Sequence, residues 1–404
     1  MVYSPLIAYL AQKNTIDTIM FDMPVQSGAL FNSIDDVYQP RLVTCFEPTR
    51  IVLARGWNRT TYSQNLTEKI LQLYPNILPE NCSNTAHPKI LINEATPYKQ
   101  HIAGKQTLVI GEHRSAVRLS SEEGNTCPNY WHFSLYGFCP YGCTYCYLAG
   151  TPGVKFSPSV KIFTNIDEVL TAIDKNVQRI ARPTAFYHGK LQDGLALDPL
   201  TGYSQQLIPF FAEHPFARQI LLTKSTDVDN LLDLDHNGHT ILSWTLQPPN
   251  ISQQFEPNTP TIADRLRAMK QCAKAGYPLR AVLMPLIPVD GWLDLYADFL
   301  MQLLESIPIQ RLTIGAICSY QAAHQLMNRK LGSINVIAQN MQRSKTEDGR
   351  MRYPEELRAK GYRHLIQTAK RLRPDLEVGL CLETYRMFEV LDMQTALGRC
   401  NCVL

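Results

Sequence analysis

Gly137-Phe-Cys-Pro-Tyr-Gly-Cys-Thr-Tyr-Cys-Tyr-Leu148 is the stretch that decides the fold predicted for this chain. Its cysteines, Cys139, Cys143 and Cys146, have the spacing C-x3-C-x2-C. Three thiolates can hold a cubane [4Fe–4S] cluster by three of its irons, which leaves the fourth iron open to a chelating ligand. We therefore expect these cysteines to bind a cluster that also binds a second molecule.

This spacing is typical of the radical S-adenosylmethionine (radical SAM) enzymes, in which SAM fills the open position. An electron then cleaves SAM and yields a 5′-deoxyadenosyl radical, which abstracts hydrogen from a substrate. Tyr145 precedes the third cysteine, where these enzymes place an aromatic ring beside adenine. The motif therefore predicts SAM as cofactor and an electron donor of the flavodoxin or ferredoxin type as partner.

Zinc sites and disulfides are the alternatives for clustered cysteines. Zinc sites use four ligands, usually in two C-x2-C pairs, and no second pair follows nearby. A disulfide scaffold is disfavoured because the chain has 404 residues and an odd count of 11 cysteines. The first residues lack the basic-then-apolar pattern of a signal peptide, so we expect a cytoplasmic protein with reduced thiols.

Composition and charge limit the number of domains and the kinds of partner that the chain can have. The chain is 45% hydrophobic, which suffices for one large core with a small appended domain, or for two domains. No run of about 18 apolar residues occurs, so we expect no membrane span. The net charge is +3, but Arg329–Arg373 holds twelve Lys and Arg against four Asp and Glu. This basic block is either a phosphate-contacting surface or a solvated helix face.

From about residue 130, apolar strand-like runs alternate with helical spacing, which predicts a parallel sheet with helical crossovers. The expected strands are Tyr130–Tyr136, Thr184–His188, Gln219–Thr223, Thr240–Leu246, Leu279–Leu286 and Arg311–Ile317. The expected helices are Ile166–Ile180, Gln205–Glu213, Val228–Leu234, Thr261–Ala275 and Leu293–Ser306. Six units predict an α/β fold with a partial (β/α)6 radical SAM barrel, and its cluster loop lies at the C-terminal mouth.

Three regions are expected along the chain. Residues 1–125 form an N-terminal α/β region, with a strand at Thr107–Gly111 and helical spacing at Gln64–Tyr74. Residues 126–320 form the partial barrel. Residues 321–404 form a C-terminal extension with the basic segment, a helix, a late strand at Glu377–Leu382 and a tail that ends in C-x-C.

Several further runs resemble the spore photoproduct lyase family of radical SAM enzymes, over roughly Phe46 to Thr384. The runs that carry the resemblance are Tyr145-Cys-Tyr-Leu148, Leu222-Thr-Lys-Ser225 with Asp229–Gly238, Phe255-Glu-Pro-Asn-Thr259 and Ala273-Lys-Ala-Gly-Tyr-Pro-Leu279. Members of this family repair a methylene-bridged thymine dimer in DNA by hydrogen abstraction. The resemblance therefore implies a lyase with DNA as one candidate partner.

Four site residues follow from the resemblance. It implies that Lys224 holds the SAM carboxylate, that Thr245 lies close to SAM and that Asp193 lies in a loop over the SAM site. It also implies that Tyr147 lies near the cofactor or in a hydrogen-transfer relay. The alternatives are a solvated lysine, an ordinary strand threonine, a turn aspartate and a packing tyrosine, and the sequence leaves them open.

Two departures put DNA as substrate in doubt. Spore photoproduct lyases carry a cysteine just ahead of the cluster loop or of the acid of the SAM site, and it donates hydrogen to the product radical. Lys190 stands where we expect this cysteine, and no cysteine lies between Cys146 and Cys272. The family also has a basic DNA-probing hairpin, and here the segment reads Arg343-Ser-Lys-Thr-Glu-Asp-Gly-Arg-Met-Arg352. Asp348-Gly349 suits a tight turn, but Glu347 and Asp348 make its tip acidic.

The tail departs from the family as well, because Cys400 and Cys402 lie beyond its usual end. A C-x-C beside Arg399 is expected to be flexible, exposed and close to a cation, a setting for reactive thiolates. It could fold over the barrel mouth and donate hydrogen in place of the missing cysteine, bind a soft metal or metalloid, or remain an unordered tail. The cysteines outside the motif and the tail are expected to be packing residues.

These observations predict a radical SAM enzyme similar to spore photoproduct lyase, with DNA photoproduct repair as one activity. The alternatives are a non-DNA substrate with Cys400 and Cys402 in the mechanism, or a non-catalytic iron–sulfur or nucleic-acid-binding protein on the same scaffold.

Overall fold

The largest sheet has eight strands in the order β16-β12-β11-β10-β9-β8-β5-β4. β4 (Val117–Ser120) pairs antiparallel with β5 at one edge, and all other neighbours pair parallel. The parallel strands are β5 (Tyr130–Phe133), β8 (Thr184–His188), β9 (Ala217–Thr223), β10 (Thr240–Leu246), β11 (Leu279–Leu286), β12 (Ile309–Ala316) and β16 (Glu377–Leu380). The expected partial barrel is confirmed, and β16 extends its parallel sheet beyond the six predicted strands.

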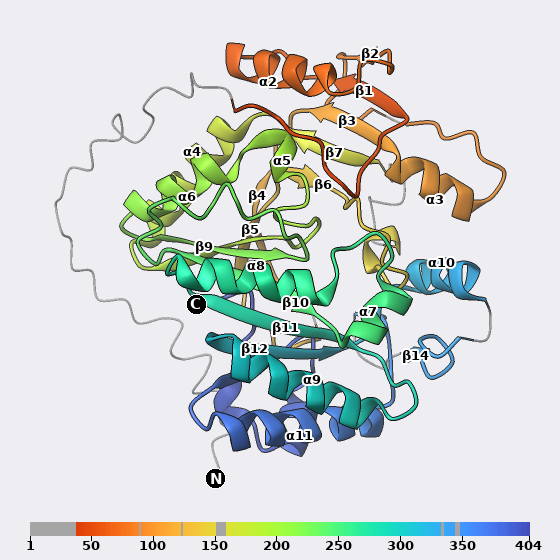
Figure 1. Ribbon diagram of the computed structural model, residues 1–404, viewed down its shortest axis with the longest axis vertical. Coiled ribbons are helices and arrows are strands. Elements are labelled where there is room, and N and C mark those ends of the chain that lie inside the picture. Colours follow the sequence, from red (N-terminus) through yellow and green to blue (C-terminus); the bar gives the residue numbers. More distant parts are fainter. Residues whose placement is uncertain (1–37, 89, 123, 151–158, 333–334, 344–347) are drawn as a thin grey trace, which may run out of the picture. The chain divides into compact units, whose positions relative to one another are not determined.

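This computed structural model describes residues 38–404 except 89, 123, 151–158, 333–334 and 344–347, and all of them lie in one unit, Asp35–Leu404 (Figure 1). The first residues of the chain and Glu347, on which two of the sequence interpretations rest, lie outside this description. Within the described residues, none of the helices is both long and apolar enough to span a membrane.

Helices connect the parallel strands. They are α4 (Ile166–Ile180), α5 (Asp198–Thr201), α6 (Ser204–Glu213), α7 (Pro249–Phe255), α8 (Ile262–Lys274), α9 (Trp292–Ser306) and α11 (Glu355–Leu372). α4 forms because Ile166, Val169, Ile173 and Val177 recur at helical spacing and are all buried. α9 and α11 pack side by side (Figure 1).

One predicted helix is wrong. Val228–Leu234 forms consecutive turns, in which Leu231 N–H donates to Val228 O at 2.9 Å and Leu234 N–H donates to Leu231 O at 3.1 Å. These bonds span three residues, as in turns, rather than four. The aspartates and asparagine of this run favour turns because their side chains compete for backbone groups.

A second sheet precedes the barrel in the order β2-β1-β3-β7-β6. Its strands are β1 (Arg50–Ala54), β2 (Glu80–Cys82), β3 (Thr107–Gly111), β6 (Tyr136–Gly137) and β7 (Val160–Phe163), and α2 (Thr61–Gln72) and α3 (Pro97–Lys105) belong to the same region. β6 and β7 lie beyond residue 125, so the second sheet takes strands from both sides of the proposed boundary. The cluster loop leaves directly from β6.

The C-terminal region adds α10 (Gln321–Leu331), a small sheet of β13 (Cys318–Ser319), β15 (Met351–Arg352) and β14 (Gln342–Arg343), and α12 (Tyr385–Val390). α10 packs against the short 3-10 helix Tyr147–Gly150 that ends the cluster loop. β16 requires glycine at position 379, because a Cβ there would lie 1.6 Å from the carbonyl oxygen of Arg399. The tail therefore runs against the barrel strand β16.

Candidate active site

A cavity of about 520 Å³ lies among the inward-facing side chains of the barrel strands. Its walls include Tyr187 of β8, Leu222 of β9, Val282 of β11 and Thr313 of β12. The cavity is also lined by every residue that the sequence singled out for a site: Cys139, Cys143, Cys146, Tyr145, Tyr147, Asp193, Lys224, Thr245, Cys400 and Cys402. The structure therefore brings the whole predicted site together.

The cluster loop is held by the end of α7 and the residues that follow it. Gly142 N–H donates to Pro257 O at 3.0 Å, and Thr144 N–H donates to Phe255 O at 2.9 Å. A Cβ at Gly142 would lie 2.7 Å from Pro257 O, so only glycine permits this approach. Phe138 has a φ of +63°, a left-handed conformation uncommon for a non-glycine residue, and it turns the chain immediately before Cys139.

A buried lysine that sequence reasoning missed also holds the loop. Lys105, the last residue of α3, donates from Nζ to Cys139 O at 2.7 Å and to Tyr141 O. Its ammonium lies 4.8 Å from the centre of the Phe138 ring. Lys105 therefore fixes the loop backbone and places a positive charge near the thiols. No sequence signal connects a lysine at the end of α3 with a motif more than thirty residues later.

The donor set fits the cubane cluster predicted from the spacing. Burial raises the pKa of the Cys143 thiol to about 11 and raises that of Cys139 well above its usual range. Bound iron would overcome this penalty, because metal coordination deprotonates a thiol. Among the described residues, no three His, Cys, Asp or Glu side chains are placed to hold a single metal ion. A cubane differs because each thiolate binds a separate iron.

Lys224 has the partners expected of a cation that stays charged when buried. Its Nζ lies 3.7 Å from Glu256 Oε1, and Glu256 is fully buried beside Arg265, whose Nη2 lies 2.7 Å from Oε2. Burial lowers the pKa of Lys224, but Glu256 and Cys143 outweigh burial and the pKa is raised. The sequence analysis missed Glu256 as a site residue, although it lies in the quoted run Phe255–Thr259.

The buried ion pairs of Glu256 predict a large loss of stability. Glu256→Gln should lower the free energy of unfolding by about 3–5 kcal/mol, because Arg265 and Lys224 would keep buried charges without a counter-charge. Denaturant unfolding would measure the change. Glu305→Gln, on the exposed side of α9, is the matched control and should stay within about 0.5 kcal/mol. Equal effects in both variants would contradict a structural role for Glu256.

Asp193 lies in the loop after β8 and lines the cavity. Its Oδ1 accepts hydrogen bonds from Thr223 Oγ1 at 2.6 Å and from the backbone N–H groups of Leu195 and Ala196 at 3.0 and 2.9 Å. Its Oδ2 accepts from the backbone N–H of Lys224 at 2.7 Å. The carboxylate lines the cavity but is engaged by four donors of the protein, so it acts as a positioning residue for Lys224.

Tyr147 and Lys190 form part of a polar wall around Glu122. Tyr147 donates from its hydroxyl to Lys190 O at 2.6 Å, and Lys190 Nζ lies 3.2 Å from Glu122 Oε1. Tyr130 donates to Glu122 Oε1 at 3.0 Å, and Arg350 Nη2 donates to Glu122 Oε2 at 2.7 Å. Lys190, at the position expected for a hydrogen donor, is therefore an ion-pair residue.

Two of the three hairpin arginines, Arg350 and Arg352, are held in ion pairs within the protein. Arg350 pairs with Glu122 and is 14% exposed at its side chain. Arg352 Nη2 lies 2.5 Å from Asp348 Oδ2 and is 3% exposed. Asp348 thus binds an arginine of its own hairpin. Arg343 on β14 is exposed.

Cys400 and Asn401 are buried and Cys402 is half-buried, so the expected exposure of the tail thiols is wrong, and the tail does not lie over the barrel mouth. Arg311 Nη1 donates to Cys400 O at 2.9 Å and to Val403 O at 2.8 Å, and Arg280 Nη1 donates to Val403 O at 2.6 Å. Both arginines lie near the starts of their strands, so the tail enters the barrel from the end opposite the cluster loop. Its thiols nevertheless line the cavity, with Cys400 only 3% exposed.

Three cysteines that were expected only to pack, Cys127, Cys318 and Cys381, also line the cavity. Cys127 precedes β5 and Cys381 follows β16, so the fold brings them together from far apart in the chain. Their spacing matches no motif, so no sequence signal indicates that they come together. Their thiols face the same space as those of the tail.

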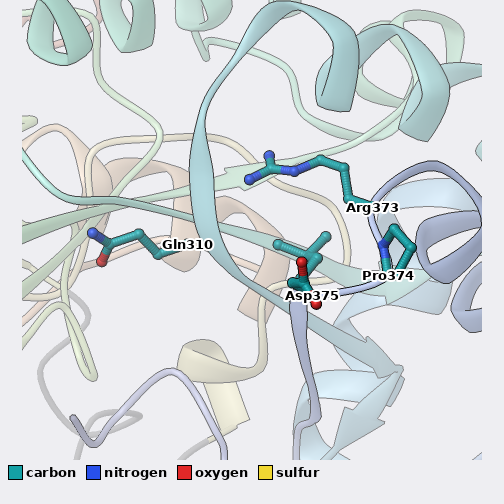
Figure 2. Close-up of a pocket in the computed structure, with 5 residues that line it drawn as sticks. Gln310, Arg373, Pro374 and Asp375 are labelled. Atoms are coloured by element: carbon teal, nitrogen blue, oxygen red, sulfur yellow. The ribbon is translucent and has the colours of Figure 1, made fainter.

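A smaller hollow of about 260 Å³ lies apart from these residues, where β12 begins and α11 ends (Figure 2). Its lining includes Gln310, Arg373 and Asp375, and Arg373 Nη2 donates to Ile309 O at 3.0 Å. No thiol lines this hollow. The larger cavity is therefore the candidate active site.

Comparison with known proteins gives one consistent family. The sequence model of the family described as spore photoproduct lyase matches residues 47–353. The spore photoproduct lyase of Geobacillus sp. (strain Y412MC61) is 30% identical over 285 residues, which are 69% of this chain and 78% of that protein. The spore photoproduct lyase of Bacillus subtilis (strain 168) is 29% identical over 248 residues, which are 60% of this chain and 70% of that protein.

Solved structures with a similar fold are also spore photoproduct lyases. A solved spore photoproduct lyase complexed with dinucleoside spore photoproduct superposes with a TM-score of 0.71 at 22% identity. The match covers 82% of this chain and 98% of that one. A spore photoproduct lyase variant solved with bound AdoMet and the same dinucleoside also gives a TM-score of 0.71 at 22% identity, with the same coverage of both chains.

Proposed function

The chain belongs to the spore photoproduct lyase family of radical SAM lyases, and from this premise we propose that it uses one [4Fe–4S] cluster and SAM to abstract hydrogen from a substrate. Cys139, Cys143 and Cys146 would hold the cluster. A thiol of the tail, Cys400 or Cys402, would return hydrogen to the product radical.

One observation carries this proposal. The three cysteines of the motif, the charged Lys224 and the two thiols of the tail all line a single cavity of about 520 Å³. The cluster loop and the tail reach it from opposite ends of the barrel strands. A radical formed near the loop would therefore meet a substrate with thiols beyond it.

The residues around the loop suit the binding of SAM. The Lys224 ammonium is held 3.7 Å from Glu256, beyond hydrogen-bond distance, and can approach an anionic ligand such as a carboxylate. Tyr145 donates from its hydroxyl to Glu256, which fixes its ring beside the motif, and Thr245 lines the cavity from β10. A bound cluster would supply the electron that cleaves SAM.

A thiol suits the last step because its S–H bond is weaker than most C–H bonds. Transfer of a hydrogen atom from a cysteine to a carbon radical therefore runs downhill. Cys400 and Cys402 line the cavity, whereas Lys190, at the position where a donor cysteine was expected, has no S–H bond to offer.

The experiment that tests this function is anaerobic reconstitution with iron and sulfide, followed by SAM and dithionite in place of the natural electron donor. We expect visible absorption from the cluster and the release of 5′-deoxyadenosine. Cys272→Ala, a buried cysteine that does not line the cavity, is the control and should behave as the parent protein. A reconstituted protein that binds a cluster but releases no 5′-deoxyadenosine would favour the non-catalytic alternative.

The substrate has two candidates. Similarity to the lyase solved with dinucleoside spore photoproduct supports a DNA-derived photoproduct. A substrate other than DNA is favoured by the hairpin, because Arg350 and Arg352 are committed to Glu122 and Asp348. Turnover assays with the dinucleoside would distinguish the two.

Salt dependence tests DNA binding through the hairpin. If duplex DNA binds there, Arg343→Ala should reduce the slope of log affinity against log salt by about 0.9, the value for one phosphate contact. Arg352→Ala should instead lower stability, because it removes the buried ion pair between Arg352 and Asp348. Arg267→Ala, an exposed arginine on α8, is the control. Wild-type protein without salt-dependent affinity for duplex DNA would exclude this use of the basic segment.

A further inference from the structure

A buried and a half-buried lysine lie beside the cluster loop. Lys105, the buried one, ends α3 and donates from Nζ to Cys139 O at 2.7 Å and to Tyr141 O. Lys330, the half-buried one, lies in the last turn of α10, and its Nζ donates to Nε2 of His101 on α3 at 3.1 Å. Lys105 therefore contacts the loop directly, and Lys330 reaches it through His101.

The ring of Phe138 joins these groups to the first cysteine of the motif. Phe138 immediately precedes Cys139, and the Lys105 ammonium lies 4.8 Å from the centre of its ring. The ring of His101 meets it edge-on, with 5.7 Å between the ring centres. α10 also packs against the 3-10 helix that ends the loop. Two cations are therefore held against the motif from the side of α3 and α10.

Both elements keep these cations in a setting that suits a charge. Burial lowers the pKa of His101 to about 2, so its ring is neutral and accepts the hydrogen bond from Lys330. Burial also lowers the pKa of Lys330, to about 8, so its ammonium keeps its proton at neutral pH. Lys105 donates to carbonyl oxygens and lies over an aromatic ring, which are both partners of a cation.

Neither cation has a counter-charge in the part of the chain that the structure describes. The described lysines that pair with a carboxylate are Lys190 and Lys224, and each faces a glutamate. Lys105 and Lys330 belong to none of these ion pairs. A charge taken out of water without a partner is costly. The adjacent groups that become anionic are the thiols of the motif, which lose their protons when they bind metal.

We propose that Lys105 and Lys330 are the counter-charges of the bound cluster and raise its reduction potential. This role rests on the proposed function, in which the three cysteines of the motif hold a [4Fe–4S] cluster. A cubane with three thiolate ligands carries a net negative charge, and reduction adds another. Net charge is one of the factors that determine the potential of such clusters. Nearby cations therefore stabilise the reduced form more than the oxidised form.

The two lysines are positioning residues, because they act through the loop and through His101 rather than on the substrate. Their effect falls on the step before the cleavage of SAM, which begins with an electron from the cluster. A cluster that is easier to reduce accepts its electron from a weaker reductant. The lysines would thus match the cluster to its electron donor.

Redox titration without SAM measures this effect apart from turnover. Reconstituted full-length protein is equilibrated anaerobically at fixed potentials, and electron paramagnetic resonance quantifies the reduced cluster. Lys330→Met should lower the ratio of reduced to oxidised cluster at a given potential roughly tenfold, a downward shift of about 59 mV for one electron. Lys105→Met should shift the potential in the same direction, and the double variant should shift it further. Lys330→Arg keeps the charge and should stay near the wild type.

Lys99→Met is the matched control, because it removes an exposed lysine of the same helix, whose charge water and salt screen. It should leave the potential unchanged. An unchanged potential in Lys330→Met and Lys105→Met would overturn the proposal and leave the proposed function standing. An equal drop in Lys330→Arg would also overturn it, because packing would then be the cause.

The loop contacts of Lys105 can affect assembly of the cluster as well as its potential. If Lys105→Met binds no cluster, Lys330→Met decides, because Lys330 donates to His101 and not to the loop carbonyls. Wild-type protein that binds no cluster would overturn the proposed function and this role together.

Discussion

Cys143→Ala should abolish both the visible absorption of the cluster and all reductive cleavage of SAM, while the protein stays folded. Two thiolates cannot hold a cubane and leave one iron open for SAM. The fold should survive because the loop is held through its backbone, by Lys105 Nζ on Cys139 O at 2.7 Å and by Gly142 N–H on Pro257 O at 3.0 Å. Neither contact involves the Cys143 sulfur.

Absorption spectra and 5′-deoxyadenosine after anaerobic reconstitution would measure this loss, and circular dichroism would check the fold. Cys45→Ala is a demanding control, because Cys45 packs against the cysteines of the motif but lies outside it. It should retain the cluster and the cleavage. Retention of SAM cleavage in Cys143→Ala would mean that the cluster is held by other residues.

Much of the barrel could be predicted because its strands are buried on both faces. The residues of β10 are all buried, and the observed bounds of β10 and β11 equal the predicted ones. That the three cysteines of the motif lie together could be predicted for a different reason, because they fall within eight residues of sequence. Both features are local, so one sequence window contains the whole signal.

The contacts that complete the site could not be predicted because they join distant segments. Lys105 reaches Cys139 from the second sheet region, and Arg311 of β12 reaches Cys400 in the tail. No spacing rule relates such residues. Asp193 shows a second limit of prediction from sequence. A family resemblance implies an acid at this position, but it does not say which groups donate hydrogen bonds to its carboxylate.

Two arginines in the sequence indicate where the tail lies. Arg280 and Arg311 interrupt the apolar runs of β11 and β12, and both are buried. A buried guanidinium requires acceptors, because an unpaired buried charge is costly. Carbonyl oxygens of the tail supply them here. Arginines within strands that are otherwise apolar therefore indicate that another segment enters the barrel.

Cys400→Ala combined with Cys402→Ala should retain the cluster and the cleavage of SAM but lose normal product. The tail should stay in place, since Arg280 and Arg311 hold its carbonyl oxygens and Ser243 holds Asn401, and none of these contacts uses a sulfur. Among the described residues, the cysteines left on the cavity would be those of the motif with Cys127, Cys318 and Cys381. The product radical would therefore lack its proposed donor.

The readout is the ratio of product to 5′-deoxyadenosine with dinucleoside spore photoproduct in deuterated water, where exchangeable thiols carry deuterium into the product. We expect deuterated product from the wild type, and a ratio lower by an order of magnitude or more, with little deuterium, in the double variant. Cys272→Ala should match the wild type in both. An unchanged ratio with full deuterium in the double variant would show that another group donates hydrogen and that the two thiols only pack at the base of the barrel.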